Sequence, residues 1–370
     1  MISGRPTRAY IDLDALAHNL TEVRRLAKGR KVLGVVKADA YGHGAVEVAQ
    51  RLEQEGVELL GVALVEEGVR LRENGIALPI LVLGGVFEHQ VYDLVKYGIT
   101  PTVFGYSQVD AYAKAATKAG KTLPVHVKVD TGMGRVGVTP AEAFEFILEL
   151  VKNPAITVQG IMTHLADAAG PDKCFAKQQI DLFAGLIDRL RDEGYEFPYL
   201  HAAGSAAIIE FDPAHFNMVR PGIMLYGCPP SPHMSATAKL RPVLSLKTAV
   251  MHLKWVDEGK PISYSRTYYT KRLSRIATLP IGYADGINRH LSNRGSVLVN
   301  GMRCPIIGTV CMDLIMVDVT DAGEVKVGDE AVIIGRQGSE EITADEVANL
   351  LETISYEVLC NVSARVPREY

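Results

Sequence analysis

Eight short apolar runs alternate with amphipathic segments between Leu13 and Tyr226, and this alternation restricts the folds open to the chain. Runs rich in β-branched residues that alternate with helical periodicity are typical of βα units around a parallel sheet. The runs are KVLGVV, LLGVA, PILVLG, TPTVF, PVHVKVD, VQGIMTH, YLHAAG and NMVR. Eight parallel strands close a barrel, whereas an open doubly wound sheet has a similar rhythm with a different strand number. We therefore expect an α/β fold with an N-terminal (β/α)8 TIM-type barrel.

The rhythm changes after about Leu240 to close-set strands with turn signals. Asn300-Gly301 predicts a tight hairpin turn between two strands. One late helix is predicted to begin at Thr343, which forms a capping box with Glu346. The pattern predicts a C-terminal mainly β domain.

The 370 residues are enough for a large barrel and a second module. We place the barrel domain at residues 11–238. The β-rich domain is expected to comprise residues 239–370 together with residues 1–10.

The charge pattern argues against two classes of partner. A net charge of −4 and a pI near 6.2 provide no basic face for nucleic acid or anionic lipid. The N-terminus lacks the order of a secretion signal, and no apolar segment is long enough to span a bilayer. We therefore expect a cytoplasmic protein that binds neither nucleic acid nor membrane.

The five cysteines are scattered and include no CxxC pair. This spacing predicts neither a zinc site nor a redox dithiol, and no metal is expected. The five are Cys174, Cys228, Cys304, Cys311 and Cys360.

Polar residues collect at the carboxyl ends of the predicted strands, where TIM barrels place their active sites. Lys37, His164, Ser205 and Arg220 each end or follow a strand, and the fifth strand runs into Asp130 and Arg135. Each has an ordinary structural explanation when it is taken alone, such as a solvated lysine or a core histidine. Together they predict one functional site.

The loops after the last two strands suit a phosphate group. They contain Ser205 in AAGSAA, and Gly222 and Ile223 in RPGIMLYG. A serine hydroxyl and backbone N–H groups bind phosphate oxygens, and glycine permits a close approach. An ordinary tight turn would have the same composition.

The segment GMGRVG, residues 132–137, matches a dinucleotide-binding fingerprint only in its letters. In that motif a helix begins inside the glycine run, whereas Pro140 places the helix start after it. We interpret the segment as an exposed loop that presents Arg135 to a carboxylate.

Lys37 ends the run KVLGVV, which is expected to be buried on both faces. An ammonium group is costly to desolvate there, so the amine is either at a surface or covalently occupied. A strand-end lysine, a phosphate site on the last strands and an arginine between them fit pyridoxal 5'-phosphate, whose aldehyde would join Lys37 as a Schiff base. A phosphosugar aldolase with a catalytic lysine is the alternative.

Several motifs occur together and in order along the chain. They are AYIDLDALAHN, VVKADAYGHG, KVDTGMGRVG, MTHLADA, VRPGIMLYG, ISYSRTY, IGYADG and GTVCMD. Over essentially its whole length the chain resembles the alanine racemases, fold-type III pyridoxal phosphate enzymes. The resemblance implies a homodimer with shared active sites that interconverts L-alanine and D-alanine and supplies D-alanine for peptidoglycan.

The resemblance also implies roles for individual residues. Lys37 would hold the cofactor and act as the base on one face of the substrate, and the partner subunit's Tyr264 would serve the other face. Arg220 would face the pyridine nitrogen and, having only donors, keep it unprotonated. The other implied cofactor contacts are Tyr41, His164, Ser205, Gly222, Ile223 and Tyr356. The implied substrate contacts are Arg135, the backbone of Met312 from the partner, and the entrance-lining Tyr283.

Four further positions follow from the resemblance. Lys128 aligns with a lysine that is carbamylated in some relatives. Gly204 and Ser265 depart from the family pattern, which commonly has asparagine and glycine there, so the second puts the backbone beside Tyr264 in question. His201 is expected to support the ring environment.

Rival functions remain from related and different classes. A fold-type III amino acid decarboxylase would share the barrel and the cofactor lysine, but would place an acid near the pyridine nitrogen. A broad-specificity amino acid racemase and a non-catalytic pyridoxal phosphate carrier are the others. The roughly 130 residues after Leu240, as expected for a separate domain, argue against the carrier.

Overall fold

The computed structural model describes residues 4–234 and 236–370. Its contacts divide the chain into two compact units. The barrel unit comprises Leu16–Ala40 and Ala45–Arg241, and the C-terminal unit comprises the residues up to Ala15, Tyr41–Gly44 and Pro242–Tyr370. The assignment of Tyr41–Gly44 to the C-terminal unit has no counterpart in the sequence analysis. The first three residues of the expected β-rich domain lie outside the described residues.

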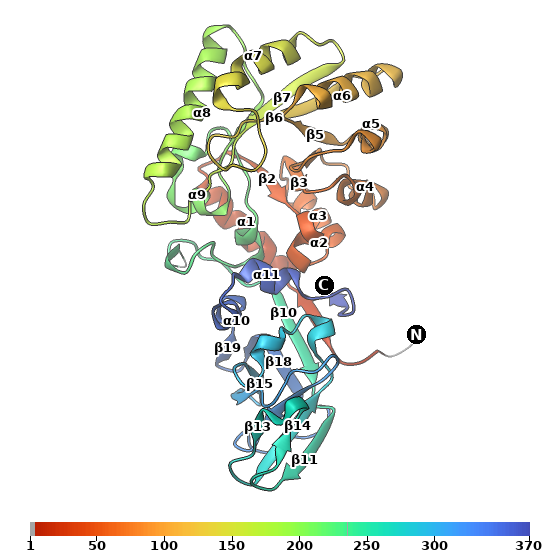
Figure 1. Cartoon of the computed structure of the whole chain (residues 1–370), viewed down its shortest axis with the longest axis vertical. Helices are drawn as coiled ribbons and strands as arrows, with labels where there is room; N and C mark the ends of the chain where they lie inside the picture. The colour runs from red at the N-terminus through yellow and green to blue at the C-terminus, as the bar shows by residue number, and fades with distance from the viewer. Residues whose placement is uncertain (1–3, 235) are drawn as a thin grey trace. The chain divides into compact units, whose positions relative to one another are not determined.

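The barrel unit is built on eight strands that follow one another in parallel register (Figure 1). They are β2 (Lys31–Val35), β3 (Leu59–Val62), β4 (Ile80–Val82), β5 (Thr100–Val103), β6 (Leu123–Lys128), β7 (Ile156–Met162), β8 (Tyr199–His201) and β9 (Met218–Val219). β9 pairs with β2, and the seam to β8 carries backbone hydrogen bonds from Asn217 to Leu200 (3.3 Å) and from Arg220 to Ala203 (2.9 Å). The prediction of an eight-stranded barrel is confirmed.

Helices alternate with these strands and lie around the outside of the barrel (Figure 1). They are α1 (Leu13–Leu26), α2 (Lys37–Gly42), α3 (Ala45–Gln54), α4 (Val65–Glu73), α5 (Val91–Tyr97), α6 (Tyr106–Lys118), α7 (Pro140–Val151), α8 (Cys174–Asp192) and α9 (Ser205–Glu210). Short 3-10 turns occur at η1 (Glu88–Gln90), η2 (Asp212–Ala214), η3 (Ile223–Tyr226) and η4 (Pro232–Met234). Leu16, Leu20 and Val23 on α1 are fully buried, as their helical spacing requires.

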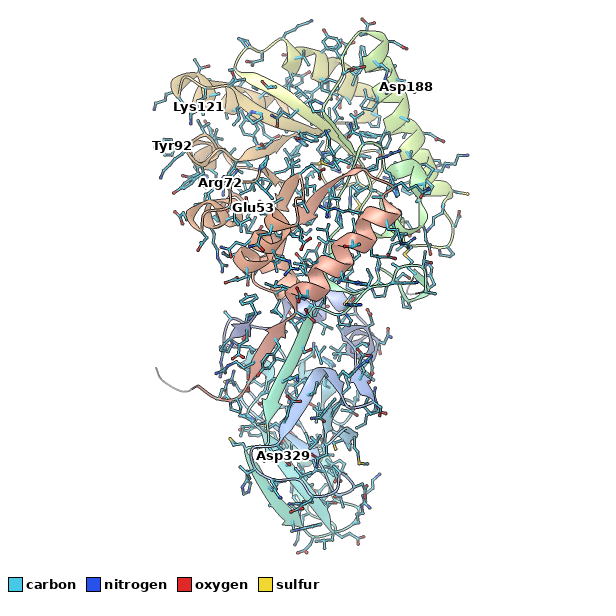
Figure 2. All side chains as sticks on the ribbon, turned by 180° about the vertical axis from the view of Figure 1, so that it is seen from behind. Glu53, Arg72, Tyr92, Lys121, Asp188 and Asp329 are labelled. Atoms are coloured by element: carbon cyan, nitrogen blue, oxygen red, sulfur yellow. The ribbon has the colours of Figure 1, made fainter. Side chains whose placement is uncertain are left out.

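Loops of the barrel are held by charged side chains of the helices. Glu53 on α3 accepts the N–H groups of Ala77 and Leu78, while Arg72 on α4 donates to the carbonyls of Ile76 and Leu78 (Figure 2). The two side chains thus fix the segment that leads into β4.

The C-terminal unit is mainly β, as predicted. Its largest sheet has seven strands, with the order β16-β15-β18-β10-β1-β20 and β19 paired to β18; β11, β14 and β17 form a second sheet and β12 and β13 a third. The strands are β1 (Arg8–Ile11), β10 (Leu244–Ala249), β11 (His252–Val256), β12 (Pro261–Ile262), β13 (Tyr268–Tyr269), β14 (Ser274–Leu279), β15 (Ser296–Val299), β16 (Met302–Pro305), β17 (Ile315–Asp318), β18 (Glu330–Gln337), β19 (Glu340–Ile342) and β20 (Arg368–Glu369). The helices and 3-10 turns are α10 (Ala344–Leu351), α11 (Ser355–Cys360), η5 (Tyr264–Arg266), η6 (Tyr283–Asp285) and η7 (Arg289–Leu291).

Two local predictions can be followed in this unit. Asn300 and Gly301 both have positive φ, +52° and +72°, and connect β15 to β16 as the predicted hairpin turn. Thr343 caps α10 by accepting the N–H of Glu346 at 3.0 Å. The Glu346 carboxylate binds Arg303, so the predicted capping box is present only in its threonine half.

No helix within the described ranges is both long and apolar enough to cross a bilayer.

Candidate active site

Lys37 follows the carboxyl end of β2 and opens a turn of unusual hand. The next four residues, Ala38 to Tyr41, all have φ between +53° and +55°, and Gly42 follows at +84°. L-amino acids disfavour this region by roughly 1–2 kcal/mol per residue, and usually occupy it singly. The backbone beside the lysine is therefore strained, and strain of this kind is concentrated at functional sites.

Carboxylates in the barrel unit hold the start of this turn. Glu67 accepts the N–H of Ala38 at 2.6 Å. Asp39 accepts the N–H of Ala45 at 3.0 Å and pairs with Arg70 at 3.1 Å. These contacts fix the backbone on the C-terminal side of Lys37.

Asp130 organises the loop that carries Arg135. Its carboxylate accepts the backbone N–H groups of residues 132–135 at 2.8–3.1 Å. Burial alone would raise the pKa of Asp130, but these hydrogen bonds hold it below its usual value. The glycine-rich loop thus gives its N–H groups to a carboxylate, and α7 begins after it at Pro140. Arg135 is exposed at its end.

Arg220 is buried and lies at the centre of a hydrogen-bond network. Its guanidinium donates to Nδ1 of His201 (3.0 Å), to the carbonyl oxygens of Thr163 (2.8 Å) and Ala202 (3.0 Å), and to Nδ1 of His164 (3.1 Å). Its Nε–H has no acceptor among the described residues. That N–H remains able to donate to a bound group.

The donors of Arg220 determine the tautomers of two buried histidines. Because arginine has no acceptor, Nδ1 of His201 must accept, and the proton of His201 is on Nε2. This Nε2–H donates to Nδ1 of His126 at 2.8 Å, so the proton of His126 is on its own Nε2. That last N–H is buried without a partner within residues 4–234 and 236–370.

Five basic groups act on one another here. Burial, followed by the charges of Arg220, Lys128, Arg135 and Lys37, holds the pKa of His164 well below its usual value. Burial, then Arg220 and Arg135, lowers the pKa of Lys128 to about 7. Burial lowers the pKa of Arg220 to about 10. The strand ends thus form a positive region in which the histidines are neutral, and negatively charged groups of a ligand would be stabilised there.

Ser205 begins α9 and connects the loops after β8 and β9. Its Oγ accepts the N–H of Gly222 at 3.0 Å and that of Met224 at 3.4 Å, and Ile223 begins η3 beside them. A hydroxyl that accepts twice retains its own proton for donation. Gly204 is the N-cap of α9, at an ordinary φ of −87°.

Tyr264, Tyr283 and Met312 belong to the C-terminal unit and are exposed by 69%, 43% and 52%. The N–H groups of Tyr283 and Ala284 donate to the carbonyls of Cys311 and Met312, both at 3.0 Å. The Tyr283 turn and the Met312 segment are therefore one connected structure.

The backbone on both sides of Tyr264 has positive φ, at Ser263 (+64°) and Ser265 (+59°). Glycine adopts this region without cost, which explains why the departure at Ser265 matters.

Tyr41 and Tyr356 also belong to the C-terminal unit, with ring centroids 6.0 Å apart. Burial, then the charges of Tyr356 and Cys360, raises the pKa of Tyr41. Tyr41 is therefore a neutral donor at physiological pH.

His126 was not among the expected site residues, and Asp130 was expected only as a polar residue at the end of the fifth strand, without a role of its own. A period-two reading of PVHVKVD would have placed His126, Lys128 and Asp130 on one face of the strand, separated by valines. The alternation was a sufficient signal for a polar layer inside the barrel.

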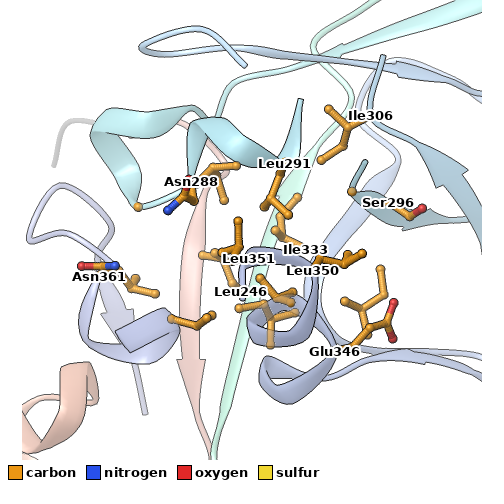
Figure 3. A pocket seen from close by; sticks show the side chains of 18 residues that line it. Leu246, Asn288, Leu291, Ser296, Ile306, Ile333, Glu346, Leu350, Leu351 and Asn361 are labelled. Atoms are coloured by element: carbon orange, nitrogen blue, oxygen red, sulfur yellow. The ribbon is translucent and has the colours of Figure 1, made fainter. Parts of the chain in front are cut away.

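An apolar cavity of about 30 Å³ in the C-terminal unit is lined by none of the expected site residues (Figure 3). Leu246, Leu291 and Leu351 contribute to its wall, and Glu346 is the one charged residue among the described residues that line it. No group of three or more histidine, cysteine or acidic residues in the described ranges could hold a metal ion.

Family models match nearly the entire chain. The N-terminal domain of alanine racemase matches residues 11–230, and the C-terminal domain of alanine racemase matches residues 243–370. The chain belongs to the alanine racemase family. The sequence-based recognition of this family, whose members are isomerases, is thereby confirmed.

Individual alanine racemases are similar over their full length. Those of Halothermothrix orenii and Symbiobacterium thermophilum are 48% and 46% identical, and in both cases the match covers 99% of this chain and 97% of the relative. Among solved alanine racemases, the Clostridium difficile 630 structure has a TM-score of 0.94 at 41% identity, covering 99% of this chain and 96% of that one. The Streptomyces lavendulae structure has 0.95 at 34%, covering 100% and 97%.

Proposed function

We propose that this protein interconverts L-alanine and D-alanine with bound pyridoxal 5'-phosphate, using Lys37 and the partner subunit's Tyr264 as two bases. The observation that carries the proposal is the positive region at the strand ends, where Lys37, Arg135 and Arg220 act on the neutral His164. A phosphate dianion and a substrate carboxylate are the ligands that such a region favours.

The donors of the barrel unit fit this cofactor. The Ser205 hydroxyl has a proton to give to a phosphate oxygen, and the Nε–H of Arg220 has no other acceptor among the described residues. Both are donors of the kind that the phosphate oxygens and the ring nitrogen of the cofactor would accept from. The proposed cofactor-holding residues are Lys37, Tyr41, His164, Ser205, Arg220, Gly222, Ile223 and Tyr356.

When bound, the cofactor would supply a conjugated ring that makes the substrate Cα–H acidic. Arg135 binds the substrate carboxylate through its guanidinium fork, together with the backbone of the partner's Met312. Lys37 removes or returns the Cα proton on one face, and the partner subunit's Tyr264 does so on the other. Two bases on opposite faces invert the configuration without consuming a co-reactant.

Arg220 controls which reaction occurs. The guanidinium of Arg220, with a pKa of about 10, stays protonated at physiological pH and would donate to the ring nitrogen of the bound cofactor, which would then hold no proton of its own. His201 and His164 are held neutral beside it and cannot deliver a proton in its place. This arrangement weakens electron withdrawal and favours return of the proton to Cα.

A homodimer would bring the two bases together. Tyr264 and Met312 are each more than half exposed, and Tyr283 is nearly so, which suits side chains that a second subunit covers. We propose that each C-terminal unit completes the active site of the partner subunit. The D-alanine product would be used for peptidoglycan.

Isotope exchange tests this function directly. The purified protein is incubated with L- or D-alanine in D2O, and optical rotation is followed together with deuterium at Cα. We expect racemisation with deuterium incorporation from either enantiomer, and its loss in Lys37→Ala, with the exposed Lys271→Ala as a matched control. Tyr264→Phe should impair proton transfer on one face, whereas Tyr269→Phe on the same unit should not.

The alternatives give different products in the same assay. Release of carbon dioxide would identify a decarboxylase. Equal rates with alanine and with larger amino acids would identify a broad-specificity racemase. Either result contradicts the proposed function.

A further inference from the structure

Arg5, close to the N-terminus, binds the one buried carboxylate of the motif IGYADG. Its NH1 donates to Oδ2 of Asp285 at 2.9 Å, and its NH2 donates to Oδ1, so the guanidinium and the carboxylate form a two-pronged ion pair. NH1 also donates to the carbonyl of Pro280 at 3.2 Å. The Asp285 side chain is fully buried, and a buried carboxylate requires such a partner.

Asp285 in turn fixes the conformation of the turn that carries Tyr283. Its Oδ2 accepts the N–H of Gly282 at 3.0 Å, and its own N–H donates to the Gly282 carbonyl at 3.0 Å. The Asp285 carbonyl accepts the N–H of Ser363 at 3.1 Å. The aspartate thus holds Gly282 at the start of the turn and connects the turn to Ser363.

The turn lies directly against the segment that contains Met312. Besides the hydrogen bonds from Tyr283 and Ala284, a Cβ atom added at Gly282 would lie 2.3 Å from the Met312 carbonyl oxygen and 2.4 Å from that of Cys311. Only glycine permits this close approach. Displacement of the turn would therefore displace the Met312 backbone with it.

A second arginine connects the same two segments. Arg365 donates to Asp313 at 2.8 Å and lies 3.6 Å from Asp285. Arg365 is about half exposed, whereas the side chain of Arg5 is 27% exposed. All these residues belong to the C-terminal unit.

We propose that Arg5 is a positioning residue for alanine selectivity, acting through Asp285 on Tyr283 and on the Met312 backbone. The inference rests on the proposed function, with Tyr283 lining the substrate entrance, where its bulk would favour a small side chain, and with Met312 as a carboxylate contact. Arg5 itself touches neither the substrate nor the cofactor in this scheme. It sets the spacing between two groups that do.

The test compares Arg5→Met with Arg5→Lys in the full-length holoenzyme. For Arg5→Met we expect KM for alanine to rise about tenfold while kcat falls less than about threefold, because the altered groups bind substrate without transferring protons. Selectivity for alanine over 2-aminobutyrate should fall by about tenfold, the discrimination typical of one methylene group. Arg5→Lys keeps the charge but loses the fork, and should fall between Arg5→Met and the wild type.

The matched control is Arg272→Met, which removes a surface ion pair with Asp321 in the same unit. It should change neither KM nor selectivity. Loss of thermal stability in Arg5→Met with unchanged KM and selectivity would overturn the proposal, because that is the signature of a purely structural pair. If Arg5→Met does not fold, the KM for alanine and the selectivity for alanine over 2-aminobutyrate are compared between Arg5→Lys and the wild type instead.

Amide hydrogen exchange separates this inference from the proposed function. We expect faster exchange at Tyr283 and Ala284 in Arg5→Lys than in the wild type, whether or not the wild type racemises alanine. Failure of racemisation in the wild type would contradict the proposed function alone. Unchanged exchange at these two amides would contradict the positioning role alone.

Discussion

Nδ1 of His201 accepts a hydrogen bond from Arg220 at 3.0 Å, and this contact determines where every proton lies in a buried chain of three side chains. The chain continues from His201 to His126 and ends at an N–H without a partner among the described residues. Burial, then the charge of Arg220, lowers the pKa of His126 to about 3. The two histidines therefore stay neutral, and the network keeps one direction throughout the physiological pH range.

Replacement of His126 tests this chain. His126→Phe keeps a ring of similar size and exchanges the unpartnered N–H of His126 for that of His201, so the net change is the loss of one hydrogen bond, which should lower the free energy of unfolding by about 0.5–1.5 kcal/mol. Urea denaturation measures the change. The exposed His252→Phe serves as control and should change it by less than about 0.5 kcal/mol. A stability equal to the wild type would show that the His126–His201 hydrogen bond is not formed.

Lys128 makes stability depend on pH in a defined direction. Its pKa is lowered from 10.5 to about 7, so between these values the unfolded chain binds the additional proton and the free energy of unfolding rises with pH. Below pH 7 the folded protein carries the full cost of the buried charge. Lys128→Met removes this cost, so the variant should be more stable than the wild type at pH 7. The difference in free energy of unfolding between the two should shrink by about 4 kcal/mol from pH 7 to pH 10.

Denaturation at several pH values, with Lys271→Met as an exposed control, tests this dependence. A constant difference between Lys128→Met and the wild type would mean that Lys128 does not titrate in this window.

Glycine and alanine substitutions should rank in opposite orders of stability at Ser265 and at a position within a strand. Ser265 has φ of +59°, so Ser265→Gly should be more stable than Ser265→Ala by about 1 kcal/mol. Ser274 lies in strand β14, where the order should reverse and glycine should be worse than alanine by about 0.5–1 kcal/mol. Thermal melts of the four variants measure both differences. The same order at both positions would contradict a left-handed residue beside Tyr264.

Ser205→Ala tests the proposed phosphate site without an activity assay. The substitution removes the acceptor for the N–H of Gly222 and the proton available to a phosphate oxygen. We expect the Kd for pyridoxal phosphate to rise about tenfold, which corresponds to about 1.4 kcal/mol. Titration of the apoenzyme, followed by absorbance, measures the change, with the exposed Ser107→Ala as control. Unchanged affinity would exclude Ser205 from the phosphate contacts.

The barrel was predictable because eight apolar runs of strand length occur at regular intervals, and strand ends determine which residues meet. On that basis Lys37, His164, Ser205 and Arg220 were expected at one site, and Lys37 and Arg220 act on His164 in the structure. The hairpin at Asn300 was equally local, since two positive φ values there require a particular dipeptide. The periodicity of apolar residues and the residue types of a turn are both local signals, because each depends on residues only a few positions apart.

Long-range pairing was not predictable in the same way. Arg5 and Asp285 are separated by 280 positions, and nothing near either one indicates the other. The bond between Arg220 and His201 required the closed barrel before the tautomers could be assigned. The hand of the Ala38–Tyr41 turn was hidden because two of its residues are alanines, which favour the right-handed form.

Four residues of mirror-image helix represent about 4–8 kcal/mol of conformational energy, which is comparable to the net stability of a whole domain. Only the contacts of the completed fold can hold the backbone in this unfavourable conformation. We expect the turn beside Lys37 to form late in folding. Unfinished or damaged molecules would then lack the backbone geometry that the proposed role of the Lys37 amine requires.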